Sequence, residues 1–216
     1  MTAVGEAVVS ATGGQHRRAL LDAAADLTAS TGWSGVTMGR LAASVGVSRQ
    51  TVYNEFGSKP ALAEAMVLDE LGRFLDAVEQ AFDRHPSDAV AAVRDAVRGV
   101  LTLAEERPLP RAIVAAGHGA ETDLLPLLTI RSGAVLDAAT TVVRNRLEAY
   151  DIGVSGARLG ATVDLVVRAV LSHVMQPGGT PAETADDLAW AVSRLLLPVS
   201  PSRPRATARR GSSVRA

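Results

Sequence analysis

The chain has 216 residues, of which 47% are hydrophobic, and its formal net charge is −1 at pH 7. A chain of this length buries about 70% of the surface that its unfolded state exposes, so its core needs no covalent or metal staple, and the small net charge excludes a uniformly basic protein. The absence of cysteine excludes disulfides, thiolate metal sites and cysteine nucleophiles, and it favours a reducing compartment.

Membrane insertion and secretion are not expected. No apolar run reaches the roughly 18 residues that a membrane helix requires, and residues 1–14 lack the basic region and apolar block of a signal peptide. We therefore expect a soluble, cytoplasmic protein with no membrane partner.

Charge is distributed unevenly along the chain. Residues 198–216 carry five arginines and no acidic residue, residues 15–60 carry five basic and three acidic residues, and residues 61–197 carry 12 basic and 19 acidic residues. An acidic body between two basic segments predicts that a polyanion would bind the ends. The alternative for residues 198–216 is an arginine-rich tail that only interacts with water.

Apolar residues recur at helical spacing with no convincing run of strand alternation, so we predict an all-α protein. Residues 1–14 and the arginine-rich tail at 198–216 are predicted to be disordered. Residues 15–60 and 61–197 are predicted to be two domains. The expected helices, about nine, lie near residues 15–31, 38–45, 49–56, 59–84, 88–106, 109–116, 124–149, 156–175 and 181–197.

The first three predicted helices have polar residues whose positions packing alone does not explain. Thr37 is placed to cap the second helix, Gly46 to end it, and Ser48 to cap the third. Val52 and Phe56, four residues apart, give the third helix its buried side. Two short helices joined by a glycine turn are the helix-turn-helix pattern.

Polar side chains occupy the faces of the third helix that its buried residues leave free. They are Arg49, Gln50, Thr51, Tyr53 and Asn54. Arginine pairs with guanine in the major groove, glutamine pairs with adenine, the threonine methyl contacts thymine, and the tyrosine hydroxyl suits a phosphate oxygen. We interpret this helix as a DNA recognition helix; the alternative is an ordinary amphipathic helix whose polar side faces water.

This part of the sequence resembles the TetR family of bacterial transcriptional regulators. The resemblance is carried by ALLDAA at 19–24, GWSGVTM at 32–38, LAASVGVS at 41–48 and TVYNEFGSK at 51–59. It implies an N-terminal helix-turn-helix domain, followed by a helical domain for ligand binding and dimerisation. We expect no catalytic residues, cofactor or metal.

The resemblance assigns DNA contacts to named positions. Thr37 and Arg40 would lie near the DNA backbone, Tyr53 would be a phosphate ligand, and Lys59 would match the family's phosphate-binding lysine. The local sequence also favours this role for Lys59, because Ser58 is placed to cap the following helix and helix amides beside a cation form an anion site. The expected contact set is Thr37, Arg40, Ser48, Arg49, Gln50, Thr51, Tyr53, Asn54 and Lys59.

Two residues depart from the family pattern. Glu55 falls where many relatives carry a histidine near the phosphates. A carboxylate there repels DNA unless it turns to a base amine or pairs with an arginine. Gly39 lies inside the short second helix, which costs about 1 kcal/mol relative to alanine.

A single short recognition helix reads few base pairs, so useful affinity requires two of them about one DNA turn apart on a symmetric dimer. The last two predicted helices carry apolar stripes that suit this role. The predicted interface residues are Leu159, Val163, Val167, Val170, Val174, Leu188, Val192 and Leu195. The alternative is that these stripes close the core of the single subunit.

The helices between 88 and 175 are rich in Ala, Val and Leu. An irregular segment at 117–128 is expected to interrupt them. We expect this segment to frame the mouth of an apolar pocket. We expect a small hydrophobic effector, fatty-acid-like or alkane-like, with His118 or Arg168 as polar anchors. The alternatives are an exposed loop position for His118 and an ion pair of Arg168 with Asp164. The segments 117–128 and 180–188 are similar to those of actinobacterial family members linked to alkane or lipid metabolism.

These observations predict a DNA-binding regulator: a repressor that binds a palindromic operator as a homodimer and is released when a ligand acts through the fourth helix. An enzyme is the first alternative, but the sequence has no phosphate-cradling glycine loop, nucleophile elbow or metal-binding helix pair, and its four histidines are far apart. A ligand-binding or scaffold protein that has lost DNA binding is the second.

Overall fold

The computed structural model describes residues 3–117 and 125–196, with side chains for residues 16–113 and 133–196. All nine regular elements within these ranges are α-helices, which confirms the predicted all-α class. They are α1 (Ala3–Thr31), α2 (Met38–Val45), α3 (Arg49–Phe56), α4 (Lys59–Arg84), α5 (Ala89–Glu106), α6 (Pro108–Gly117), α7 (Leu125–Leu147), α8 (Gly156–Met175) and α9 (Pro181–Leu196).

Eight of these nine described helices begin and end within two residues of the predicted positions. Helix α1 is the exception, because it begins at Ala3 where residues 1–14 were expected to be disordered. Extending a helix that packing already holds costs far less than nucleating one, so the alanines and valines before Gly13 continue it. The predicted tail at 198–216 lies outside the described residues.

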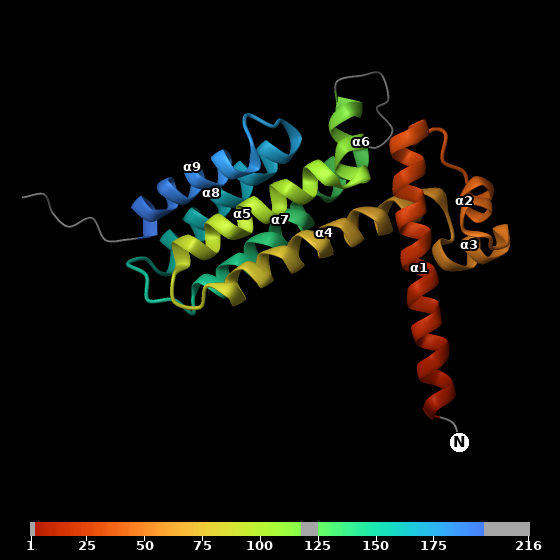
Figure 1. Ribbon diagram of the computed structural model, residues 1–216, viewed down its shortest axis with the longest axis horizontal. Helices are drawn as coiled ribbons and strands as arrows, with labels where there is room; N and C mark the ends of the chain where they lie inside the picture. Colours follow the sequence, from red (N-terminus) through yellow and green to blue (C-terminus); the bar gives the residue numbers. More distant parts are fainter. Residues whose placement is uncertain (1–2, 118–124, 197–216) are drawn as a thin grey trace, which may run out of the picture.

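The helices form a small domain at one end of the molecule and a larger bundle at the other (Figure 1). Helices α1, α2 and α3 make the small domain. Helix α4 leaves it and runs along the bundle, where α5, α7, α8 and α9 pack, while α6 lies against α1. Helix α4 is therefore shared by both parts.

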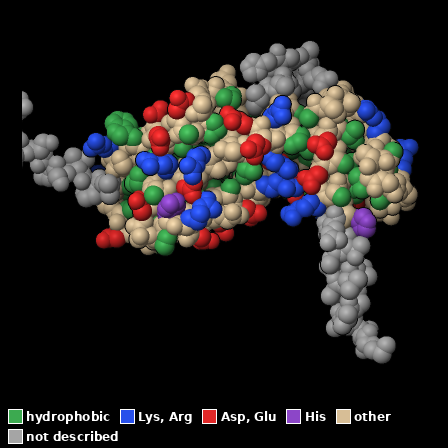
Figure 2. Space-filling view, in the orientation of Figure 1, with side chains coloured by type: hydrophobic (Ala, Val, Ile, Leu, Met, Phe, Trp, Pro, Cys, Tyr) green, Lys and Arg blue, Asp and Glu red, His purple; other side chains and the backbone are tan. Residues whose placement is uncertain are grey.

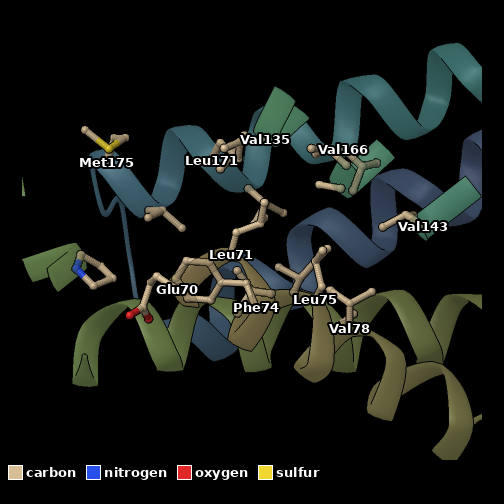
Figure 3. Close-up of a pocket in the computed structure, with 18 of the residues that line it drawn as sticks. Glu70, Leu71, Phe74, Leu75, Val78, Val135, Val143, Val166, Leu171 and Met175 are labelled. Carbon is tan, nitrogen blue, oxygen red and sulfur yellow. The ribbon is translucent and has the colours of Figure 1, made fainter. Parts of the chain in front are cut away.

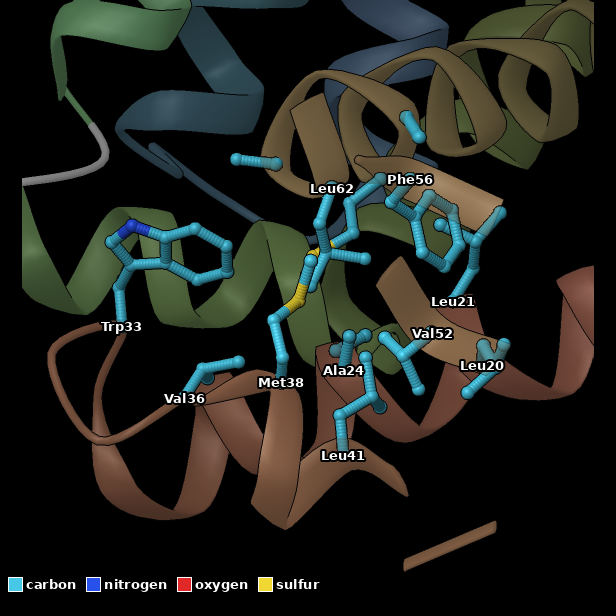
Figure 4. Packing of buried hydrophobic residues seen from close by; sticks show 14 of the residues in the cluster. Leu20, Leu21, Ala24, Trp33, Val36, Met38, Leu41, Val52, Phe56 and Leu62 are labelled. Carbon is cyan, nitrogen blue, oxygen red and sulfur yellow. The ribbon is translucent and has the colours of Figure 1, made fainter. Parts of the chain in front are cut away.

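Two clusters of buried hydrophobic side chains correspond to these two parts. In the first cluster Leu41 and Val52 are fully buried, and Leu62 at the start of α4 packs with them (Figure 4). Leu109 and Ile113 of α6 also belong to this cluster. The second cluster joins the later part of α4 to α5, α7, α8 and α9. Helix α6 thus packs against the helix-turn-helix core although it follows the bundle helix α5 in sequence.

Among the described helices, none combines the length and the hydropathy that crossing a bilayer requires.

Candidate functional site

The ends of α2 and the start of α3 are fixed by the capping residues that the sequence predicted. The hydroxyl of Thr37 accepts from the backbone N–H of Arg40 at 3.2 Å, and Ser48 Oγ accepts from the N–H of Thr51 at 3.0 Å. Gly46 ends α2 with φ at 75°, a left-handed conformation that glycine adopts without a steric penalty. The predicted helix-turn-helix geometry is therefore confirmed.

Helix α3 presents its polar residues to solvent. Val52 and Phe56 are buried, as predicted from their spacing. The five polar residues between Arg49 and Asn54 are all exposed, so they form one continuous surface on the helix.

Internal pairs organise this surface. Arg49 Nη2 donates to the hydroxyl of Tyr53 at 3.2 Å, and the Arg49 guanidinium lies 5.3 Å from the centre of the Tyr53 ring. Gln50 Nε2 donates to Asn54 Oδ1 at 2.8 Å. Both pairs join residues one turn apart, which restricts side chains that would otherwise be free. Because all four are exposed, DNA would replace these contacts at little cost.

Arg40 lies at the start of α2 and is also exposed. Its Nη1 donates to the carbonyl oxygen of Gly35 at 2.6 Å, so the guanidinium holds the loop that precedes the helix. The hydroxyl of Thr37 is already used as the cap, and the hydroxyls of Ser48 and Thr51 bond each other at 2.8 Å. These side chains therefore fix the geometry of the motif, and their contact with DNA stays a prediction.

Lys59 is half-buried at the start of α4. Its ammonium donates to the carbonyl oxygen of Trp33 at 2.7 Å and lies 4.8 Å from the centre of the Trp33 ring. Ser58 caps the helix as predicted, because its Oγ accepts from the N–H of Ala61 at 3.2 Å. An ammonium has three donors, so two remain for a phosphate beside the helix terminus.

Glu55 pairs with an arginine, one of the two arrangements in which a carboxylate here does not repel DNA. Its Oε1 lies 2.6 Å from Nη1 of Arg17 in α1, and the Arg17 guanidinium also lies 5.0 Å from the centre of the Phe56 ring. Sequence reasoning missed Arg17, since the partners are 38 positions apart and no local pattern joins them.

An apolar cavity of about 190 Å³ lies in the bundle (Figure 3). Helices α4, α5, α6, α7 and α8 all contribute to its wall, with Phe74 and Leu71 on one side and Val166 and Leu171 on the other. Glu70 is the one ionisable residue among those that line it. A cavity of this composition favours a hydrocarbon over water.

Of the two expected polar anchors, Arg168 does not line this cavity. Arg168 lies on an exposed face of α8 and is not among the lining residues. Its Nε donates to Asp164 Oδ2 at 2.8 Å, which confirms the ion pair named as its alternative. That hydrogen bond lowers the pKa of Asp164 and raises the pKa of Arg168. His118 lies outside the described residues.

Glu70, which sequence reasoning missed, is bound by Arg107. The residue is 6% exposed, and Arg107 Nε donates to both of its oxygens, at 3.2 and 3.3 Å. Burial alone lowers the pKa of Arg107, but hydrogen bonds and charges from Glu70 and Asp22 raise it above its usual value, so the guanidinium stays charged. A signal was present in the sequence, because Glu70 lies midway between Met66 and Phe74 in an apolar stripe.

Most residues of α8 and α9 that were predicted to form a dimer interface lie inside the single subunit. Leu159, Val163, Val167 and Val192 are between 1% and 7% exposed and pack within the subunit, so they cannot meet a partner. The half-buried residues Val170, Val174 and Leu188 pack against the same cluster. The core-closing alternative thus holds for the four buried residues, because α5 and the neighbouring helices already cover that side.

Other apolar side chains of α8 and α9 are exposed. Leu165 is 58% exposed, Trp190 is 65% exposed, and Leu195, which was in the predicted set, is 42% exposed. Single exposed leucines are common, but a largely exposed tryptophan on the same pair of helices is not. The space-filling view shows how charged side chains spread over the face of the bundle that it presents (Figure 2).

Within the described ranges, no three His, Asp or Glu side chains are grouped in a way that could hold a metal ion.

Comparisons with known proteins match both parts of the chain. The family described as "Bacterial regulatory proteins, tetR family" matches residues 20–66, and the family described as "Bacterial Tetracyclin repressor, C-terminal domain" matches residues 88–194. The HTH-type transcriptional regulator AlkX of Mycobacterium tuberculosis is 30% identical over 182 residues, which is 84% of this chain and 83% of that protein.

Solved structures agree with these matches. The TetR family repressor AlkX from Dietzia sp., implicated in biodegradation of n-alkanes, is 29% identical with a TM-score of 0.65, covering 82% of this chain and 93% of its own. The TetR family regulator PfmR from Thermus thermophilus is 18% identical with a TM-score of 0.55, covering 81% of this chain and 97% of its own, and shows likeness of fold alone.

Proposed function

Because this chain belongs to the TetR family of bacterial transcriptional regulators, we propose that it represses transcription by binding a palindromic operator as a homodimer, from which a small hydrophobic effector releases it. Family membership makes it a DNA-binding transcriptional regulator and not an enzyme. The observation that carries the proposal is that one helix serves both parts of the molecule. Helix α4 begins at Lys59, beside the recognition helix, and seven of its residues between Val67 and Phe82 line the cavity.

The exposed surface of α3 supports operator binding. Arg49, Gln50 and Asn54 offer donors and acceptors for base edges, while Tyr53 and Lys59 offer donors for phosphate oxygens. The cap of Ser58 also leaves the N-terminus of α4 able to receive a phosphate.

The exposed apolar residues of α8 and α9 support a homodimer. Leu165, Trp190 and Leu195 replace the buried valines as the proposed contact residues. Burying a tryptophan against its symmetry mate would remove a large apolar area from water, and tryptophan is enriched among the residues that dominate interface energy. Two recognition helices on such a dimer read two half-sites of a palindrome.

The cavity supports a hydrophobic effector. Its lining contains a single carboxylate, already neutralised by Arg107, so transfer of a hydrocarbon chain from water is favourable while an unpaired charge is not. The similarity to AlkX of Dietzia sp., implicated in biodegradation of n-alkanes, points to the same class of compound. We therefore propose an alkane-like molecule as the first candidate and a fatty-acid-like molecule as the second.

Operator binding is tested by fluorescence anisotropy with DNA from the region that flanks the protein's own gene, across a salt series. Wild type should select this DNA over a scrambled duplex and saturate at two chains per site. Tyr53→Ala and Lys59→Ala should both weaken binding, and Lys59→Ala should lower the salt slope by about one. Arg144→Ala, which removes an exposed cation of α7 that also forms an ion pair one turn along its helix, is the matched control and should change neither quantity. Weak binding that ignores sequence and all three substitutions would favour a scaffold that has lost DNA binding.

The effector class is tested by adding n-decane or decanoic acid to the operator complex. A coupling of about 1–3 kcal/mol would weaken operator binding roughly 5- to 150-fold, and the operator would weaken effector binding by the same factor. Response to only one of the compounds separates the alkane-like from the fatty-acid-like class. An operator affinity that neither compound changes contradicts the effector part of the proposal.

A further inference from the structure

Helix α6 faces both functional parts of the molecule. Leu109 and Ile113 line the cavity, and the same two side chains are buried in the helix-turn-helix core. The helix also lies against α1 (Figure 1). A change in the width of the cavity near α6 therefore acts directly on a helix that packs against the DNA-binding domain.

An ion-pair chain joins the same two parts at the start of α6. Arg107 lies between α5 and α6, and its Nη2 donates to Glu70 Oε2 at 3.3 Å and to Asp22 Oδ1 at 3.4 Å. Asp22 belongs to α1, whereas Glu70 belongs to the wall of the cavity (Figure 3). Asp22 Oδ1 also accepts from Arg73 Nη2 at 2.8 Å, and Arg73 bonds Asp69 within α4 at 3.0 Å.

The two ion pairs of Arg107, with Glu70 and with Asp22, differ in strength. The side chain of Glu70 is only 7% exposed, so separating it from Arg107 would leave a buried carboxylate without a partner. The side chain of Asp22 is 44% exposed, and its contact with Arg107, at 3.4 Å, is the longest that the guanidinium makes. A displacement of Arg107 therefore breaks its bond to Asp22 before its bonds to Glu70.

We propose that the chain Glu70–Arg107–Asp22 is the joint through which filling of the cavity is transmitted to helix α1 of the DNA-binding domain. This inference rests on the proposed function. A ligand at the Glu70 end separates α4 from the start of α6, and Arg107, held by Glu70, leaves Asp22. Helix α1 then keeps the Asp22–Arg73 pair but loses its charged link through Arg107 to Glu70, and the recognition helices lose the spacing that the operator requires.

The test compares Asp22→Asn with Arg73→Gln. Both substitutions remove the ion pair between Asp22 and Arg73, but only Asp22→Asn removes the one between Asp22 and Arg107. Operator affinity is measured with and without n-decane, and with and without decanoic acid. Wild type and Arg73→Gln should show the same fold-weakening, whereas for Asp22→Asn the fold-weakening should approach one.

Two further variants, Arg107→Lys and Ala139→Phe, test the same ion pairs, and Ala139→Phe does so without a ligand. Arg107→Lys retains a cation for Glu70 but lacks the fork that reaches both carboxylates, so it should lose the response as Asp22→Asn does. Ala139→Phe fills the cavity from α7 and should weaken operator binding in the wild-type background but not together with Asp22→Asn. A purely structural role for Asp22 would lower stability without abolishing these responses.

Failure of the ion-pair proposal and failure of the proposed function give different results. If wild type responds to a compound or to Ala139→Phe, and Asp22→Asn responds by the same factor, the joint is overturned and the proposed function stands. If wild type responds to neither compound nor to Ala139→Phe, the effector part of the proposed function fails and the joint fails with it.

Discussion

Arg17 of α1 and Glu55 of the recognition helix α3 form an ion pair with 2.6 Å between Nη1 and Oε1. Their side chains are 44% and 33% exposed, so the pair adds only about 0–1 kcal/mol to stability. Its main consequence is electrostatic, because it cancels a negative charge on the helix that would read DNA and occupies a cation that would otherwise be available to a phosphate.

Glu55→Gln should therefore bind the operator more tightly and with a steeper dependence on salt. The substitution frees Arg17 and removes one negative charge, so the slope of log affinity against log salt should steepen by about 0.9 if Arg17 gains one phosphate contact. Anisotropy titrations at several salt concentrations measure this slope. The double variant Arg17→Gln, Glu55→Gln should return to the wild-type slope, and a Glu55→Gln slope equal to wild type would rule the explanation out.

Trp190→Glu should convert the protein to monomers. A charged residue in place of a tryptophan that the proposed interface buries costs about 2 kcal/mol, or about 30-fold in the dimer dissociation constant. Analytical ultracentrifugation across a concentration series measures the change. Leu68→Glu is the matched control, because Leu68 is 50% exposed on α4 and should leave the dimer intact. If Trp190→Glu dimerises with unchanged affinity, this face of α9 is not part of the dimer interface.

The helix bounds that the sequence predicted correctly are those set by capping residues close to them in sequence. Thr37, Gly46 and Ser48 act within a few residues of themselves, so the bounds of α2 and α3 follow from them. The start of α1 was missed because the glycines that suggested disorder lie within a helix held by packing further along. Capping chemistry is readable from sequence, but the extension of an existing helix past weak residues depends on tertiary contacts.

Contacts between distant residues explain the remaining differences. On α8, Val163 is buried whereas Leu165, two positions later, is exposed. Only the position of the neighbouring helices decides which side of α8 is covered. Glu70 and Arg107 are 37 positions apart, and neither residue specifies the other. The exposed polar surface of α3 was thus predictable from the sequence, whereas the exposed apolar residues of α8 and α9 and the polar end of the cavity were not.

Asp95→Asn should destabilise the protein at neutral pH but not at low pH. Burial raises the pKa of Asp95, but hydrogen bonds and charges from Arg84 and Arg98 lower it further, so the net shift is downward. A lowered folded-state pKa contributes stability above the unfolded value of about 3.9, and this stability is lost as the pH falls through the folded value.

The expected difference for Asp95→Asn is about 1 kcal/mol at pH 7, because both arginines are more than half exposed and solvent screens them. Urea unfolding of both proteins between pH 7 and pH 2.5 measures it. A difference that keeps its full size at the acid end of that range would mean that the carboxylate charge is not its source.

Gly39 and Gly46 should respond to alanine in opposite directions. A Cβ placed on either residue meets nothing within 4 Å, so space does not distinguish them. Gly39 lies within α2 with negative φ, where alanine lowers the entropy of the unfolded chain, and Gly39→Ala should raise the free energy of unfolding by up to about 1 kcal/mol. Gly46 has φ at 75°, where a Cβ strains the backbone, and Gly46→Ala should lower it by roughly 1–2 kcal/mol. Thermal and urea unfolding of the two variants would measure the contrast, and a shift of the same sign in both would show that backbone conformation does not set the preference for glycine at this turn.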